Sequence, residues 1–266
     1  MKRLVLVLLA ALLGHAASAR ATDSQDCPAA ALGLLGRELK LAHFVASPDA
    51  GGKDPAGIVI ASTCKRLPDE PRLTLVAASW DAHQEDSKAL AIAIVDEAAG
   101  SVVAVLRDDI PEDATTQVRE TSLHLDTAPY QLAPGVRAFG LDIASENNNC
   151  GDGGVGPMRT LYVREGRTLR PVLADLFVTE YTWLRGNQPR CVADPREAAK
   201  AILEDRAVTI GLGRPGRTGW RDLVLTVTAN RSDHKPVRKP LHVTVPYDGK
   251  AYDLQAFQEA SRRWSK

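Results

Sequence analysis

The sequence predicts a mainly β protein built from antiparallel hairpins, propeller-like or sandwich in form, with a few short peripheral helices. Three segments carry this prediction, because each combines an apolar run, a short polar turn with glycine, and a second apolar or aromatic run. They are AIVDEAAGSVVAVL, LYVREGRTLRPVL and VTVPYDGKAYDL. Similar hairpins are typical of sheet repeats, but a simple chain of β-meanders gives the same pattern.

The first 19 residues have the pattern of a secretory signal peptide. Lys2 and Arg3 precede an apolar run, and the Ala-Ser-Ala ending at position 19 fits the rule for signal peptidase. We expect cleavage after Ala19 and a periplasmic or secreted protein. No later segment is long and apolar enough to cross a bilayer, so we expect no membrane span.

All four cysteines follow the signal peptide. An even number of cysteines in an exported chain predicts two disulfides. Of the three possible pairings, we favour Cys27 with Cys64 and Cys150 with Cys191, because each closes a moderate loop within one half of the chain. A zinc site of four cysteines is disfavoured, since the spacings contain no C-x-x-C.

The remaining chain divides into two expected parts. Residues 20–57 are expected to form an N-terminal helix and loop, since leucines recur at helical spacing after Cys27 and a Pro/Gly/Asp-rich stretch follows from Ser47 to Gly57. Residues 58–266 are expected to form a β-rich domain.

Within the β-rich domain the apolar runs and turn signals place the elements in order. The expected strands and hairpins are Ile58 to Ser62, Leu73 to Trp80, a hairpin in Ala89 to Leu106, Thr121 to Asp126, Arg137 to Ile143, a hairpin in Thr160 to Leu173, Asp175 to Leu184, Val208 to Leu212, Leu223 to Ala229, and a hairpin in Leu241 to Leu254. Two helices are expected, one from Asp194 to Asp205 and one ending near Trp264.

A loop rich in side-chain oxygens follows the strand ending at Ile143. Carboxylates and amides in this pattern are ligands that calcium accepts with irregular geometry, and nearby glycines let the backbone turn. The candidate calcium ligands are Asp142, Glu146, Asn147, Asn149 and Asp152. The alternative is an unliganded polar loop, since Asn, Asp and Gly also dominate loops that bind nothing.

Tyr162 and Arg164 follow this loop on a predicted strand. A tyrosine beside an arginine is a common anchor pair in protein interfaces, so both are candidate partner-binding residues, although a structural role in the strand is the competing interpretation. No catalytic residue is assigned, because G-x-S-x-G and H-E-x-x-H are absent. Two pairs, Asp81 with His83 and His124 with Asp126, are spaced for one face of a strand.

Charge argues against nucleic acid as a partner. The chain has 33 basic and 33 acidic residues, and removal of the basic signal peptide leaves it slightly acidic. A protein with this balance has no long-range attraction for a phosphate backbone.

The final third contains the motif G-x-x-D-L followed by Y-D-G-K-x-Y. Its residues are Gly219, Asp222, Leu223, Tyr247, Asp248, Gly249, Lys250 and Tyr252. The pattern resembles exported bacterial β-proteins related to calcium-binding propeller-like repeats. The acidic calcium loop of such repeats is replaced here by GRPGRTG, so the resemblance implies no metal at that point.

The export signal and hairpin organisation also resemble periplasmic immunity proteins that inhibit peptidoglycan hydrolases. That resemblance implies a non-catalytic binding protein with a protein partner, for example a cell-wall hydrolase whose cleft receives a loop, as in lysozyme inhibitors. The S-G-x-x-Y signature of lysozyme inhibitors is absent. Two alternatives stay open, a secreted hydrolase using carboxylates or the His-x-Asp pairs, and a structural envelope protein.

Overall fold

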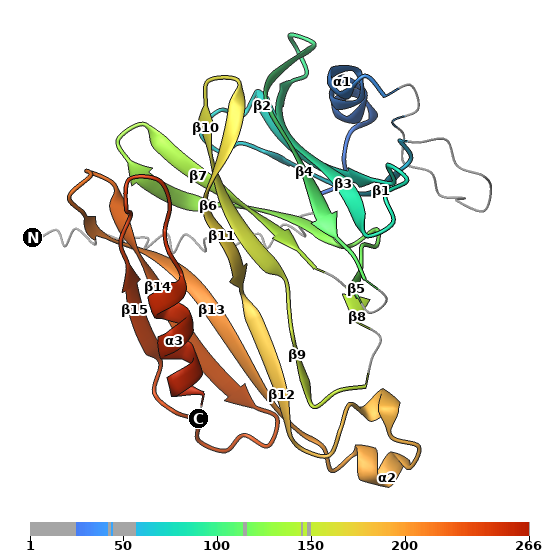
Figure 1. Ribbon diagram of the computed structural model, residues 1–266, viewed down its shortest axis with the longest axis vertical. Helices are drawn as coiled ribbons and strands as arrows, with labels where there is room; N and C mark the ends of the chain where they lie inside the picture. The colour runs from blue at the N-terminus through green and yellow to red at the C-terminus, as the bar shows by residue number, and fades with distance from the viewer. Residues whose placement is uncertain are drawn as a thin grey trace, which may run out of the picture.

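The computed structural model describes residues 25–41, 44, 57–113, 116–144, 146–147 and 150–265, and its fold is mainly β, as predicted. The predicted signal peptide, residues 1–19, and most of the predicted loop from Ser47 to Gly57 lie outside these ranges. The described strands form three larger antiparallel sheets that pack through shared apolar cores, as in a sandwich (Figure 1).

The two inner strands of the N-terminal sheet are buried on both faces. Its strands lie in the order β1 (Val59–Arg66), β2 (Leu73–Trp80), β3 (Ser87–Asp96) and β4 (Ser101–Pro111). Every residue of β2 is buried, because helix α1 (Ala29–Leu39) covers one face and the central sheet covers the other. This two-sided burial explains why β2 reads as a continuous apolar run rather than as an alternating one.

The central sheet separates two apolar cores. Its strands lie in the order β11 (Thr168–Phe177), β10 (Met158–Glu165), β7 (Val136–Ile143) and β6 (Leu123–Ala133). Successive side chains on a strand point to opposite faces. One face packs on the N-terminal sheet and the other packs toward the C-terminal sheet. The short strands β5 (Thr116–Gln117) and β8 (Glu146–Asn147) pair with each other.

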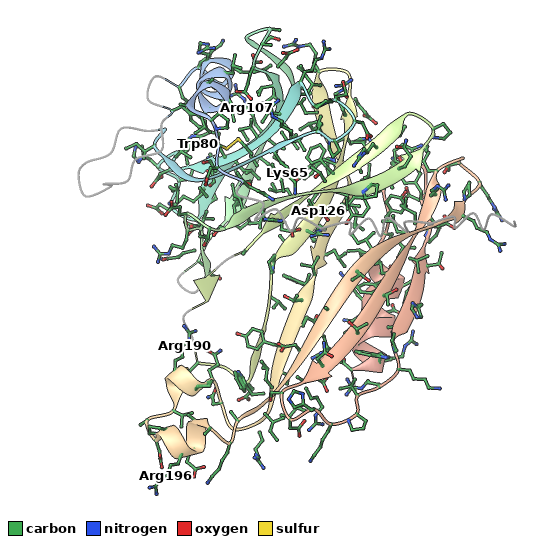
Figure 2. The ribbon with its side chains drawn as sticks, turned by 180° about the vertical axis from the view of Figure 1, so that it is seen from behind. Lys65, Trp80, Arg107, Asp126, Arg190 and Arg196 are labelled. Atoms are coloured by element: carbon green, nitrogen blue, oxygen red, sulfur yellow. A yellow bond between two sulfur atoms is a disulfide. The ribbon has the colours of Figure 1, made fainter. Side chains whose placement is uncertain are left out.

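The C-terminal sheet carries the predicted C-terminal helix on one face. Its strands lie in the order β15 (Leu241–Val245), β14 (Arg221–Arg231), β13 (Ile202–Pro215), β12 (Thr179–Arg185) and β9 (Gly153–Val155). Helix α3 (Gln255–Trp264) packs beside β15. Figure 1 views this sheet from the side of α3, and Figure 2 views it from the opposite side.

A long two-stranded ribbon joins the central and C-terminal sheets. The chain runs from β9 into β10 and from β11 into β12, while β10 pairs with β11 and β9 pairs with β12. The ribbon turns at Gly166, as predicted, and its φ of 63° is a left-handed conformation that glycine adopts at no steric cost. The two sheets therefore share nearly continuous strands.

The predicted disulfide pairing is confirmed. Cys27 is bonded to Cys64, which ties the start of α1 to β1. Cys150 is bonded to Cys191, which closes the open end of the ribbon between the segment before β9 and the segment after β12.

The predicted helix from Asp194 to Asp205 is largely wrong. The described chain forms only the short helices η1 (Pro189–Cys191) and α2 (Pro195–Ala198) before β13 begins. Asp194 caps α2 as expected, since its carboxylate accepts a hydrogen bond from the Arg196 amide at 2.8 Å. Pairing of β13 with β12 on one side and β14 on the other outweighs the local helix preference.

Gln25 fastens the N-terminal segment to the edge of the central sheet. Its side-chain Oε1 accepts hydrogen bonds from the Leu125 amide at 2.8 Å and from the Thr63 hydroxyl at 2.5 Å. Its Nε2 donates to the Leu125 carbonyl at 2.9 Å. The Gln25 amide therefore satisfies both backbone groups of Leu125, as a neighbouring strand would.

Replacing Gln25 with glutamate is expected to lower the free energy of unfolding by about 2 kcal/mol. The carboxylate keeps the shape of the side chain but cannot donate to the Leu125 carbonyl, which is left without that hydrogen bond. Urea unfolding followed by circular dichroism measures the change. Gln255→Glu at the exposed start of α3 is the matched control and should cost nothing. Equal effects of the two substitutions would contradict the anchoring role.

Candidate functional site

The predicted calcium ligands are not all free to bind a cation. Asp142 lies on β7 and is held by Arg159, whose Nε and Nη2 donate to the carboxylate at 2.6 and 2.7 Å. Asp152 is exposed. The side chains of Glu146 and Asn147, and the whole of Asn149, lie outside the described residues. Asp142 is thus already neutralised by a guanidinium, and calcium binding by the other residues stays a prediction.

The prediction that Tyr162 is an exposed anchor for a partner is wrong. Tyr162 is only 3% exposed, and its ring stacks on Phe139 with centroids 5.8 Å apart. Burial raises the pKa of the Tyr162 hydroxyl above its usual range. The N-terminal sheet covers this part of β10. Tyr162 therefore belongs to the core.

Arg164 lies on the same strand but nearer its exposed end. Its guanidinium pairs with Glu70 at 3.5 Å, and both side chains are partly solvent-exposed. A small hollow of about 90 Å³ lies beside them. Arg164 remains accessible as a contact residue, but without the tyrosine that was expected beside it.

The two predicted His-and-Asp pairs differ in the structure. Asp81 and His83 lie in a loop, where the His83 amide donates to the Asp81 carboxylate at 2.7 Å and forms a turn. His124 and Asp126 lie on β6, and the His124 ring contacts the Gln25 amide at 3.3 Å. Neither pair is joined by a third ligand, since no metal-binding group of three or more His, Cys, Asp or Glu is found among the described residues.

Asp126 belongs to an ion-pair cluster with Arg159. Arg159 Nη1 lies 2.5 Å from the Asp126 carboxylate, while its other nitrogens hold Asp142. The Tyr130 hydroxyl donates to Asp126 at 2.7 Å. Burial opposes the charge on Arg159, but the hydrogen bonds to Asp142 and the attraction of both carboxylates outweigh it and raise the pKa of the guanidinium. Figure 2 labels Asp126 near the centre of the molecule.

The side chains of this cluster are largely buried and already paired with one another, so they are not available to a substrate. The side chains of Arg159, Asp126 and Asp142 are 17%, 18% and 9% exposed, and each carboxylate already accepts charged hydrogen bonds. A general base needs a proton of the substrate within hydrogen-bond reach. The geometry therefore favours a structural role, which holds β6, β7 and β10 together.

The residues of the propeller-like resemblance form a packed turn. Tyr247 stacks on Trp220 with ring centroids 4.1 Å apart, and the Tyr252 hydroxyl donates to the Arg221 carbonyl. Asp248 accepts hydrogen bonds from the amides of Lys250 and Ala251, which lower the pKa of its carboxyl. Turn formation and packing thus account for the tyrosines and the aspartate of this pattern.

A candidate site for a small ligand is a hollow beside α3, here called the α3 hollow. It has a volume of about 250 Å³ and lies between α3 and the strands β12, β13 and β14. Its apolar lining is Leu176, Phe177, Val208, Val227, Leu254 and Phe257. The rest of the lining is polar or charged: Asp175, Glu180, Arg206, Gln258, Ser261, Arg262 and Ser265. A concave surface that combines an apolar part with polar groups can hold a small molecule.

The hollow exists because α3 covers only part of the sheet. The helix packs on the side of β15, and its flank facing β13 is polar. This flank presents Gln258, Ser261, Arg262 and Ser265 at helical spacing. The opposite wall is formed by Val208 and the neighbouring strand residues. The strand wall therefore combines apolar side chains with the ion pair of Glu180 and Arg206, and the flank of the helix offers hydrogen bonds.

Two large apolar side chains are exposed at this side of the sheet. Phe177 lines the hollow and is 39% exposed, and Val155 is 52% exposed. Val155 pairs across the strands with Glu180, which also lines the hollow, so Val155 lies on the same face. Adjoining exposed apolar side chains at a concavity mark a binding surface more often than isolated ones do.

Two other hollows are larger but chemically different. One of about 390 Å³ lies beside Cys64 and is lined mainly by charged and polar side chains. The other, of about 350 Å³, lies beside α2 and includes Arg185, Glu197 and Lys200. Neither offers the apolar wall that makes the α3 hollow suitable for a small ligand.

The α3 hollow was missed in the sequence because its walls are far apart along the chain. They come from β11, β12, β13, β14 and the C-terminal helix. The available signal was the polar flank of the predicted helix, with Ser261 and Ser265 spaced to share one side. No local pattern showed which strands this flank would face.

Comparisons with known proteins give no match that would name a family. No family model matches the chain, and no curated protein and no solved structure matches it significantly. Within the described ranges, no helix has both the length and the apolar character needed to cross a membrane. The candidate function therefore rests on the geometry of the α3 hollow and on the two disulfides.

Proposed function

We propose that the protein is an exported, non-catalytic binding protein that takes a small ligand in the α3 hollow. The hollow carries this proposal because it combines concavity, an apolar wall and a few hydrogen-bonding groups. Two disulfides support an oxidising compartment outside the cytoplasm. The fully paired Arg159 cluster supports binding rather than catalysis by Asp126 or Asp142.

Replacing Val208 with tryptophan is expected to abolish ligand binding. The indole would fill the hollow from its apolar wall, and the fold should survive because Val208 is only partly buried. The probe is anilinonaphthalene sulfonate, whose fluorescence rises in apolar sites. We expect its affinity to fall at least tenfold. A melting curve of the variant checks that the protein is folded.

Thr209→Trp is the matched control, because Thr209 is the next residue on β13, is exposed and points to the opposite face of the sheet. It should bind the dye as the natural protein does. Phe177→Ala, which removes the exposed ring at the hollow, should lower the affinity for the dye without filling the site. Equal binding by the Val208 and Thr209 variants would sink the proposed site.

The prediction of a protein partner, for example a cell-wall hydrolase, is a separate proposal. Arg164 supports a contact surface because its side chain is 39% exposed, whereas the buried Tyr162 contributes nothing to it. Inhibition of a purified peptidoglycan hydrolase by the protein tests this proposal. Loss of inhibition in Arg164→Ala would place the contact at this end of β10, and a hydrolase unaffected by an excess of the protein would refute it.

A further inference from the structure

The α3 hollow is polarised along the helix. Its upper part, beside the start of α3, is walled by Leu254 and Phe257 from the helix segment and by Phe177 from β11. Its lower part, beside the end of α3, is walled by Ser261, Arg262 and Ser265. One turn and a half of helix, roughly 8 Å, separates Phe257 from Arg262. An occupant along the hollow would therefore meet apolar groups at one end and donors at the other.

At the polar end of the hollow, one arginine side chain has no carboxylate partner among the described residues. Arg206 pairs with Glu180 at 3.0 Å and approaches Glu204 at 3.9 Å. Glu204 also accepts a hydrogen bond from Arg238 at 3.0 Å. Arg262 is exposed and has no carboxylate within 4.0 Å in the part of the chain that the structure describes. Of the two arginines that line the hollow, Arg206 is therefore paired and, within the described ranges, Arg262 is not; the second lining carboxylate, Asp175, lies on β11 two residues from Phe177.

Contacts of Trp264 hold the C-terminal end of α3 in place, and so fix the position of the backbone at Arg262. The Trp264 indole Nε1 donates to the Lys239 carbonyl at 2.8 Å. The Arg238 guanidinium lies over the Trp264 ring at 5.1 Å, a geometry that adds cation–π attraction. The helix wall is therefore preorganised at the end that carries the unpaired cation.

We infer that the ligand of the α3 hollow is a small anionic amphiphile, a chain of medium length that ends in a carboxylate or phosphate. This inference rests on the proposed binding function. The head group would accept hydrogen bonds from the Arg262 guanidinium and from the Ser261 hydroxyl, whereas the Ser265 hydroxyl already donates to the Arg262 carbonyl at 3.1 Å. The chain would lie along Val208 and the ring of Phe177. A volume of about 250 Å³ is just below the range of about 300–1,000 Å³ for drug-sized ligands, which suits a chain of medium length.

The test displaces the bound dye with three ten-carbon compounds, decanoate, decyl phosphate and decanol. We expect both anions to bind about fivefold more tightly than decanol at low salt, as a partly exposed charge pair allows. Raising the ionic strength should remove this difference. Shortening decanoate to octanoate removes two methylenes and should weaken binding roughly fifteenfold, because each buried methylene contributes about fourfold.

Arg262→Gln is the deciding variant, and Arg263→Gln is its matched control on the exposed side of the same turn. The first should reduce the affinity for both anions to that of decanol and leave decanol unchanged. The second should change neither. If the natural protein binds the anions and decanol equally, and Val208→Trp abolishes all binding, the proposal of an anionic ligand is wrong. The proposed site is then still supported. Displacement that is unaffected by Val208→Trp would overturn both.

Discussion

Replacing Arg159 with methionine will lower the free energy of unfolding by about 3 kcal/mol. The substitution leaves Asp126 and Asp142 without the guanidinium that each touches at 2.5–2.6 Å, and an uncompensated charge in a largely buried place is strongly destabilising. Chemical denaturation at neutral pH measures the loss. This loss lies at the lower end of the usual range of about 3–5 kcal/mol for a broken buried ion pair, because the cluster keeps some contact with solvent.

Two further variants separate charge from packing. Arg164→Met changes an arginine on the same strand whose ion pair with Glu70 is partly exposed, and it should cost less than about 1 kcal/mol. Adding Asp126→Asn and Asp142→Asn to Arg159→Met should restore at least half of the loss, since no buried charge remains. A triple variant as unstable as the single one would show that the methionine disturbs packing and that the charges matter little.

Removing the Cys27–Cys64 disulfide will lower the free energy of unfolding by about 4 kcal/mol. The bond closes a loop of 37 residues, and the chain-entropy model gives roughly this value for a loop of that length. Cys64 is also 6% exposed and packs in the core beneath α1, so alanine is the replacement that best preserves packing. Urea unfolding of Cys27→Ala/Cys64→Ala measures the effect.

The second disulfide provides the comparison. Cys150–Cys191 closes a loop of 41 residues, so chain entropy predicts nearly the same loss for Cys150→Ala/Cys191→Ala. Because it joins exposed and half-exposed residues at the base of the ribbon, its removal should leave α1 protected in hydrogen exchange. A loss below about 1 kcal/mol for the Cys27 and Cys64 variant would show that packing alone restrains this segment.

Much of the fold could be predicted because its signals are local. The apolar run Leu73 to Trp80 corresponds to β2 residue for residue, and Gly166 marks the turn of the ribbon. The helix expected up to Asp205 failed for the opposite reason. Strand β13 is stabilised by partners at distant positions, and local propensity contains no information about them.

The candidate site was harder to predict because burial depends on what covers a face. Alternation along β10 places Tyr162 and Arg164 on the same side of the strand, but it does not show that the N-terminal sheet covers Tyr162. From the sequence alone, the carboxylate of Asp142 could bind either a metal ion or a positively charged side chain. In the structure an arginine from the neighbouring strand supplies the cation.

The ribbon through the central and C-terminal sheets has a consequence for how the molecule opens. Its base is closed covalently by Cys150 and Cys191, and its strands belong to both sheets. Neither sheet can separate without breaking hydrogen bonds in the other, so the two should unfold as one cooperative unit. The α3 hollow lies where the ribbon passes from one sheet to the next, at Phe177. A ligand bound there would therefore stabilise both sheets against unfolding.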